Sequence, residues 1–136
     1  MTTPVTFASL RIESEWDDQR LAPLLRQIAE EFCEWASSEL GWIPCVTSIW
    51  RSVQENALAE AKTQIHCFWR AIDFRTKDRP ESDVVTATRW INERWVYDAS
   101  RPDLPVAYSA PHGTGLHLHL QVHSATVLRA PLTEVA

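Results

Sequence analysis

Residues 115–122 alternate apolar and polar side chains without interruption, and this pattern constrains the fold more than any other in the chain. A period of two is typical of a strand that buries one face. His117, His119 and Gln121 then share one face of the strand, and the opposite face is apolar. Four of the five histidines lie between residues 112 and 123. The sequence therefore predicts a strand that presents imidazoles in a form suited to a metal site.

Three segments have the spacing of apolar residues that is typical of amphipathic helices. They are residues 17–40, 52–62 and 82–95. Asp17 and Asp18 suit the positive end of the first helix dipole. Pro23 fits a first turn, so the regular part of this helix is expected to begin near Leu21. Gly41 is expected to end it.

Two further strands are predicted over residues 46–50 and 68–74, and residues 97–115 are expected to be irregular. Residues 126–136 are expected to form an edge strand or a tail. With 136 residues, 45% of them hydrophobic, and no internal repeat, the chain is expected to form a single domain over residues 1–136. The sequence predicts an α+β fold in which helices pack against a small antiparallel sheet.

Composition excludes several classes of partner. A net charge of −5 argues against nucleic acid, which needs clustered Lys and Arg. No run approaches the roughly 18 apolar residues of a membrane span, and residues 1–12 lack the pattern of a signal peptide. We therefore expect a protein made in the cytoplasm, without a membrane partner. Cys33, Cys45 and Cys67 have no CxxC spacing, which predicts buried, unpaired thiols.

A catalytic zinc site needs about three N, O or S ligands and one further position for water. His119 is one candidate ligand, and His66 and Asp73 are two more. In one unbroken strand, His66 and Asp73 would face opposite ways and lie ~23 Å apart. They can share a metal only if the chain bends between them, with His66 before the turn and Asp73 in the strand after it.

The order His66-x6-Asp73, followed by His117-Leu-His119 on a strand, resembles the zinc peptidases of the D-Ala-D-Ala carboxypeptidase and L-Ala-D-Glu endopeptidase type. Their superfamily includes lysostaphin-type enzymes and the Hedgehog signalling domain. The resemblance covers roughly residues 46–123. It implies a Hedgehog or D-Ala-D-Ala peptidase-like fold, a zinc cofactor and peptidoglycan stem peptides as substrate. The lack of a signal peptide is compatible with a phage or prophage endolysin that acts on the cell wall after release, or with peptide recycling in the cytoplasm.

The resemblance also implies a role for five residues. The zinc ligands of the family correspond to His66, Asp73 and His119. His117 corresponds to a residue beside the metal that stabilises charge or moves a proton. Arg51 corresponds to the arginine that faces the substrate carbonyl oxygen or carboxylate. These roles agree with general chemistry, since zinc polarises a carbonyl and a guanidinium can oppose a developing oxyanion.

The chain departs from the family pattern at three positions. Gln64 and Trp69 occupy the places of a family serine and glycine. Leu116 replaces the glutamate that many carboxypeptidase members use as general base. These departures motivate a second hypothesis, in which a catalytically inactive domain of the family's shape keeps a structural metal or binds a partner.

Several candidates also have a purely structural interpretation that the sequence leaves open. His117 and His119 are compatible with the exposed face of an ordinary strand. Asp73 is compatible with a turn, or with an ion pair to Arg70 or Arg75.

Other polar and aromatic residues have open roles too. Arg51 is compatible with a solvated position at a helix start. His123 lies ~13 Å from His119 along the strand and is expected outside the ligand set. His112 is in a loop that could line the cleft. Trp69 is the tryptophan expected to form a wall of the cleft.

Overall fold

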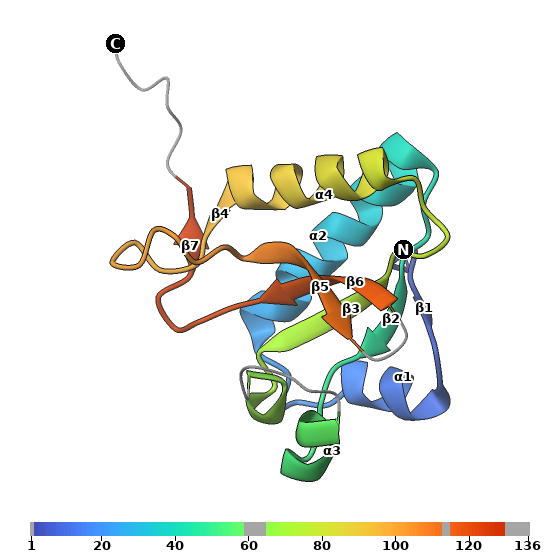
Figure 1. The fold of residues 1–136 in the computed structure, drawn as a ribbon, viewed down its shortest axis with the longest axis vertical. Coiled ribbons are helices and arrows are strands. Elements are labelled where there is room, and N and C mark those ends of the chain that lie inside the picture. Colours follow the sequence, from blue (N-terminus) through green and yellow to red (C-terminus); the bar gives the residue numbers. More distant parts are fainter. Residues whose placement is uncertain (1, 59–64, 113–114, 130–136) are drawn as a thin grey trace.

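The computed structural model describes residues 2–58, 65–112 and 115–129, and Figure 1 shows their arrangement. The helices of this part are α1 (Leu10–Trp16), α2 (Pro23–Leu40), α3 (Val53–Leu58), the 3₁₀ helix η1 (Ile65–Phe68) and α4 (Glu81–Arg94). The strands are β1 (Thr6–Phe7), β2 (Cys45–Ser48), β3 (Ala71–Arg75), β4 (Trp95–Val96), β5 (Ala107–His112), β6 (Gly115–Gln121) and β7 (Val127–Leu128). Helices packed with a sheet confirm the predicted α+β class.

Five of these strands form one sheet in the order β1-β2-β3-β6-β5, and β4 and β7 form a separate two-stranded ribbon. Three neighbouring pairs in this order are antiparallel, namely β2 with β3, β3 with β6, and β6 with β5. β1 runs parallel to β2, so the prediction of an antiparallel sheet is wrong at this edge. A strand of two residues is too short to carry a period-two pattern, and the sequence therefore gave no sign of it.

The centre of the sheet packs against α2, which passes behind it in Figure 1. Ile72 and Phe74 of β3 are fully buried, and the ring of Phe74 lies 5.2 Å from the ring of Phe32 in α2. Leu118 and Leu120 of β6 are also fully buried. Each such side chain stabilises the fold by about 1.5–3 kcal/mol relative to an exposed position. This apolar layer fixes β3 and β6, which carry two of the candidate ligands.

The helix predicted over residues 17–40 corresponds to α2 and begins only at Pro23, and a separate helix, α1, comes before the predicted range. Asp17 caps the C-terminus of α1, and both Asp17 and Asp18 lie in the connection to α2, so the expectation that they begin a helix is wrong. Pro23 is the first residue of α2, because its ring has no N–H to continue a helix from the residues before it. Gly41 ends α2 with a left-handed φ of 60°, as predicted.

The other two predicted helices are present. Ser52 and Glu55 form a capping box, in which the side chain of each accepts from the backbone N–H of the other. α3 follows directly, and residues 59–62 of the predicted helix lie outside the described residues. α4 agrees with the prediction to within one residue at each end. It lies across the upper end of the sheet in Figure 1 and stacks Trp90 on Trp35 of α2 at 4.7 Å.

The strand predictions need two corrections. The strand expected over residues 68–74 begins only at Ala71, because η1 and a turn at Trp69 come first. Residues 97–115 are not irregular throughout, since β5 pairs with β6 over Ala107–His112. Its proline is tolerated because β5 is at the edge of the sheet, where an N–H is not needed. β7 is the predicted late strand, and residues 130–136 lie outside the described part.

The three cysteines are unpaired, as expected. Cys33 is fully buried, and burial raises the pKa of its thiol. Cys45 and Cys67 are only partly buried, so the prediction of burial is wrong for these two. Their thiols lie in β2 and η1, at the margin of the core rather than within it.

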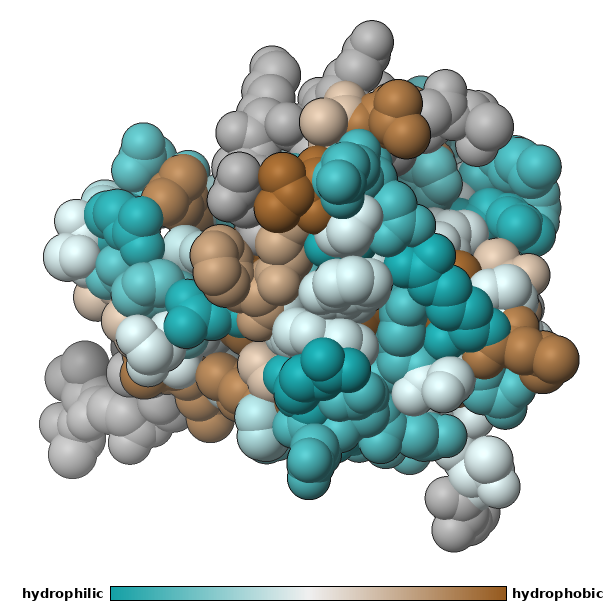
Figure 2. Space-filling view, turned by 90° about the horizontal axis from the view of Figure 1, so that it is seen from below, coloured by the Kyte–Doolittle hydropathy of each residue, from teal (hydrophilic) through white to brown (hydrophobic). Residues whose placement is uncertain are grey.

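The described part of the chain contains no helix that is long and apolar enough to cross a lipid bilayer. Figure 2 shows the end of the molecule seen from below, where hydrophobic side chains lie in separate patches among hydrophilic ones. This face is therefore mixed in character.

Candidate metal centre

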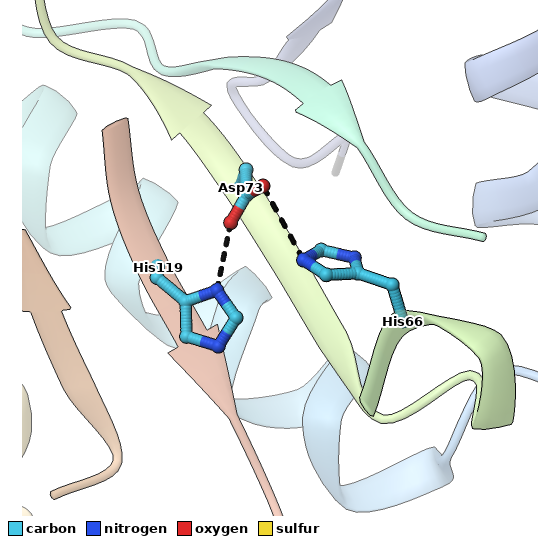
Figure 3. A group of neighbouring side chains, drawn as sticks. All are labelled: His66, Asp73 and His119. Carbon is cyan, nitrogen blue, oxygen red and sulfur yellow. Dashed lines mark hydrogen bonds and ion pairs between the residues drawn. The ribbon is translucent and has the colours of Figure 1, made fainter. Parts of the chain in front are cut away.

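Three side chains that are distant in the sequence meet on one face of the sheet (Figure 3). His66 comes from η1, Asp73 from β3 and His119 from β6. Each residue offers one ligand atom, and these atoms all lie within 4.8 Å of one another. The structure thus brings together the three residues that the sequence predicted as metal ligands.

The chain bends between His66 and Asp73 in the way that a shared site requires. η1 holds His66 before the turn, and Asp73 lies within β3 after it. At the turn, Trp69 has a φ of 61°, a left-handed conformation that favours glycine. Its ring stacks on Trp50 at 6.0 Å, and the guanidinium of Arg20 lies 4.6 Å from the ring centre. Contacts of its ring with Trp50 and Arg20 therefore help to hold a strained backbone in place.

The pairing of β3 with β6 positions the other two ligands. Asp73 and His119 are direct partners across the antiparallel pair. Because successive residues in a strand point to opposite faces, both side chains point away from the apolar layer under α2. Direct cross-strand partners have Cβ atoms about 4.5–5.5 Å apart, close enough for their polar atoms to meet. This arrangement confirms that the alternation in residues 115–122 reflects a strand.

Asp73 lies at the centre of the cluster. Its Oδ1 is 2.9 Å from Nδ1 of His119, and its Oδ2 is 3.3 Å from Nε2 of His66. The three side chains are only 1–3% exposed. Burial alone raises the pKa of the Asp73 carboxyl, but its interactions with His119 and His66 outweigh that effect and hold the pKa well below the usual range. Asp73 is therefore present as a carboxylate.

The two imidazoles have defined orientations, because each has a carbonyl oxygen at its far side. Nδ1 of His66 donates to the backbone oxygen of Ile49 at 2.9 Å. Nε2 of His119 donates to Oε1 of Gln121 at 3.1 Å. The Gln121 amide nitrogen donates in turn to the backbone oxygen of Pro105 at 2.9 Å, which fixes the amide so that its oxygen faces His119. A carbonyl oxygen only accepts, so the proton of each neutral imidazole lies on that far nitrogen.

The donor set fits a divalent metal ion. With a proton on that far nitrogen, each ring approaches an oxygen of Asp73 favourably only if its near nitrogen also carries a proton and donates to the carboxylate, or if a cation lies between the two atoms. Two acceptors that face each other repel unless a proton or a cation lies between them. Two imidazole nitrogens and one carboxylate oxygen are also a familiar ligand set for zinc, and a second hydrogen bond on each ring is typical of metal-bound histidine. The residues present could therefore hold a metal ion.

Arg51 lies directly against the candidate ligand Asp73. Its Nη2 donates to Oδ2 of Asp73 at 2.9 Å, and its Nη1 donates to Oδ1 of Asn56 at 3.4 Å. The residue is only 8% exposed, which excludes the solvated position at a helix start. Asp73 lies within a strand, so it does not close a turn. The guanidinium helps to keep Asp73 ionised and oriented, and its contact with substrate stays a prediction.

The other histidines occupy different surroundings. His117 lies two residues before His119 on β6 and is partly buried. In the strand register it lies opposite Arg75 of β3. His123 accepts at Nδ1 from the backbone of Ala125 at 3.1 Å, and among the described residues it is not part of the ligand group, as expected. The side chain of His112, which was expected to line the cleft, lies outside the described part.

Two residues of the site had no predicted role. The strand pattern put Gln121 on the same face as His119, and this shared face was the signal for the hydrogen bond between them. Tyr108 lies opposite His119 on β5, with its ring 4.7 Å from the imidazole. Burial and the charge of Asp73 raise the pKa of Tyr108. No signal for Tyr108 was available, because residues 97–115 gave no strand pattern.

Comparison with known protein families, with curated proteins and with solved structures gives no match for this chain. The case for a function therefore depends on the site itself and on the motif residues.

Proposed function

We propose that this protein is a zinc-dependent peptidase that cleaves peptide bonds in bacterial peptidoglycan stem peptides. One observation carries the proposal: His66, Asp73 and His119 converge with ligand atoms within 4.8 Å of one another, in the order and strand context of the zinc carboxypeptidase and endopeptidase motifs. These three residues are far apart in the sequence, and they meet because η1, β3 and β6 are adjacent in the fold.

The conformation of Trp69 supports the family resemblance. The motif has glycine at this position, and φ at Trp69 is 61°, in the region that glycine adopts at least cost. The backbone path between His66 and Asp73 is thus of the kind that a glycine motif requires, although the side chain differs. Here the stacking of Trp69 on Trp50 offsets part of the strain.

Each residue of the site has a distinct task in this proposal. Zinc supplies Lewis-acid chemistry, since it polarises a carbonyl and makes water more acidic. Hydrolysis adds one water to the carbonyl carbon, breaks the C–N bond and leaves a carboxylate and an amine. Arg51 orients Asp73 through the bond at 2.9 Å and is proposed to oppose charge on the substrate oxygen. His117 is proposed to carry a proton to the leaving nitrogen.

A second candidate function is a structural or partner-binding metal domain without catalysis. Two observations favour it: the three ligand residues are only 1–3% exposed, and Leu116 stands where a catalytic glutamate is found in many carboxypeptidases. A structural metal site is typically closed, whereas a catalytic one keeps a position open to substrate.

Two measurements separate these alternatives. Metal analysis of protein purified without an affinity tag is expected to give about one zinc per chain, lost in His119→Ala but kept in His123→Ala, the matched control outside the cluster. Absence of bound metal in the parent protein contradicts both proposals. Incubation with purified peptidoglycan is then read by mass spectrometry for new peptide termini. Chelator-sensitive products support the peptidase, and a metal-loaded protein without products across several wall types supports the structural alternative.

A further inference from the structure

A pocket of about 560 Å³ lies beside the metal centre. Gln121 and Tyr108 form part of its lining. Both also touch His119, Gln121 through the hydrogen bond at 3.1 Å and Tyr108 through ring contact at 4.7 Å. A ligand in this pocket therefore lies next to a residue that would hold the metal.

The pocket offers apolar surface to a ligand. Phe68 of η1 is 64% exposed, and Leu104, in the connection that precedes β5, is 37% exposed. Large apolar side chains that gather at a concave site are typical of ligand binding. Tyr108 adds a half-buried aromatic ring. The pocket thus suits a short segment of a peptide rather than a fully solvated ion.

The charged groups in the lining are both arginines, and the described lining residues include no acid. Arg101 is already paired with Asp98 at 2.9 Å. Arg70 is exposed, and within the described part of the chain no carboxylate is bonded to it. Among the described residues, the pocket therefore presents one guanidinium that is not paired with an acidic side chain.

The backbone of Arg70 is held on both sides. Its N–H donates to the oxygen of Ile65 in η1 at 3.3 Å, and its oxygen accepts from the N–H of Val122 at 3.0 Å. The residue also follows directly on the packed turn at Trp69. The fixed backbone sets the position from which the Arg70 side chain reaches the pocket, and a guanidinium can make a planar, two-point contact with a carboxylate.

We propose that this pocket binds a substrate residue next to the cleaved bond, and that Arg70 selects a carboxylate on that residue. The proposal rests on the peptidase function proposed above and names a feature of its substrate. The carboxylate belongs either to a side chain or to the chain terminus of the peptide. Apolar contacts with Phe68 and Leu104 hold the neighbouring part of the peptide.

The test uses zinc-loaded protein and three synthetic stem-type peptides. One peptide has both carboxylates, one has its side-chain carboxylate replaced by carboxamide, and one has its C-terminus amidated. Affinity is measured by isothermal titration under conditions in which mass spectrometry shows the peptide intact, and kcat/KM is measured separately. The proteins are the parent chain, Arg70→Gln, Arg70→Lys and Arg89→Gln, the last an equal charge change at an exposed position on α4.

Arg70→Gln is expected to lower affinity for the full carboxylate peptide by about 10- to 100-fold, as for loss of a charge-assisted hydrogen bond. Amidation of the carboxylate that Arg70 binds is expected to cause a similar loss of affinity in the parent chain. With that amidated peptide, Arg70→Gln lowers the affinity no further. Arg70→Lys restores part of the affinity, and Arg89→Gln changes it less than about twofold.

The two proposals fail in different ways. Equal affinity of the parent chain for carboxylate and carboxamide peptides, or an equal loss for all three peptides in Arg70→Gln, overturns the carboxylate pocket even if cleavage occurs. A carboxylate preference that depends on Arg70 but comes without any cleavage upholds the pocket and overturns the peptidase.

Discussion

The two faces of the β3–β6 pair are buried to a similar degree but are built from opposite kinds of residue. On the face toward α2, Phe74 and Leu118 are fully buried among apolar neighbours. On the other face, Asp73 and His119 are 1% and 3% exposed. Burial of the apolar face stabilises the fold directly, whereas a buried polar group costs free energy unless it is fully paired. The comparison separates an apolar face that stabilises the sheet from a polar face whose residues could hold a metal ion.

The largest effect on stability is expected on the apolar face. Phe74→Ala removes a ring that packs on Phe32 at 5.2 Å and is expected to lower the free energy of unfolding by about 3–5 kcal/mol. Urea denaturation in the presence of a chelator measures this change. A loss below about 1 kcal/mol would mean that this face does not dominate the stability of the sheet.

The polar face is expected to contribute to stability mainly when metal is bound. Zinc at 100 times its dissociation constant should raise the free energy of unfolding by about 2.7 kcal/mol. His119→Ala should abolish this increase. Leu118→Ala, the neighbour on the opposite face, should destabilise the protein but keep the increase. Thermal unfolding with and without zinc measures the difference, and an equal response in both variants would contradict the division between the faces.

The hydrogen bond from His119 to Gln121 sharpens the comparison, because it is polar but does not touch the metal. Gln121→Met keeps the size of the side chain and removes its oxygen, which frees the ring of His119 to turn. Zinc affinity is expected to fall about 10- to 100-fold. Gln27→Met, at an exposed position on α2, is the control and should leave the affinity unchanged. Competition with a zinc-sensitive dye provides the measurement, and unchanged affinity in Gln121→Met would show that this bond does not orient His119.

The turn at Trp69 matters for both faces, because it leads from His66 into β3, and β3 contributes side chains to each face. At most positions alanine is more stable than glycine, but φ at Trp69 is 61°. We therefore expect Trp69→Gly to be more stable than Trp69→Ala by about 1 kcal/mol, although both are less stable than the parent chain. Chemical denaturation of the two variants measures this order. The reverse order would mean that the backbone relaxes out of the left-handed region.

An exposed polar contact is expected to have the smallest effect. Arg11 bonds to Glu55 at 2.8 Å, and these hydrogen bonds lower the pKa of Glu55 from 4.5 to about 2. Because the pKa of Glu55 is lower in the folded state, the contact stabilises the fold above pH 4.5. This contribution to the free energy of unfolding is lost as the pH falls toward 2. Solvent screening keeps it below about 1 kcal/mol for Arg11→Gln at neutral pH. Denaturation across pH 2 to 6 tests this, and a difference that grows toward low pH would contradict the assignment.

Much of the site could be predicted from the sequence, because its parts carry strong local patterns. The alternation around His119 identifies a strand and its polar face, and the distance argument for His66 and Asp73 predicts a bend that η1 and Trp69 supply. The contact of Arg51 with Asp73 was not predicted, since it depends on how the segment after β2 approaches β3. Pairings of this kind arise from tertiary packing and have no local signature.

The fold was less predictable where elements are short or interrupted by proline. α1 has seven residues and was not predicted, because so short a helix shows few repeats of the helical spacing. β5 contains Pro111, which is unusual inside a sheet and is accommodated only because this strand lies at the edge. The sequence therefore predicts long, periodic elements well, and the partners of short ones depend on the assembled sheet.

The most direct test of the account is a crystal of the zinc-loaded protein measured at the zinc absorption edge. We expect one anomalous peak about 2.0–2.2 Å from Nε2 of His66, a carboxylate oxygen of Asp73 and Nδ1 of His119. A fully loaded crystal with no peak at these three atoms, or with its peak at other histidines, would contradict it.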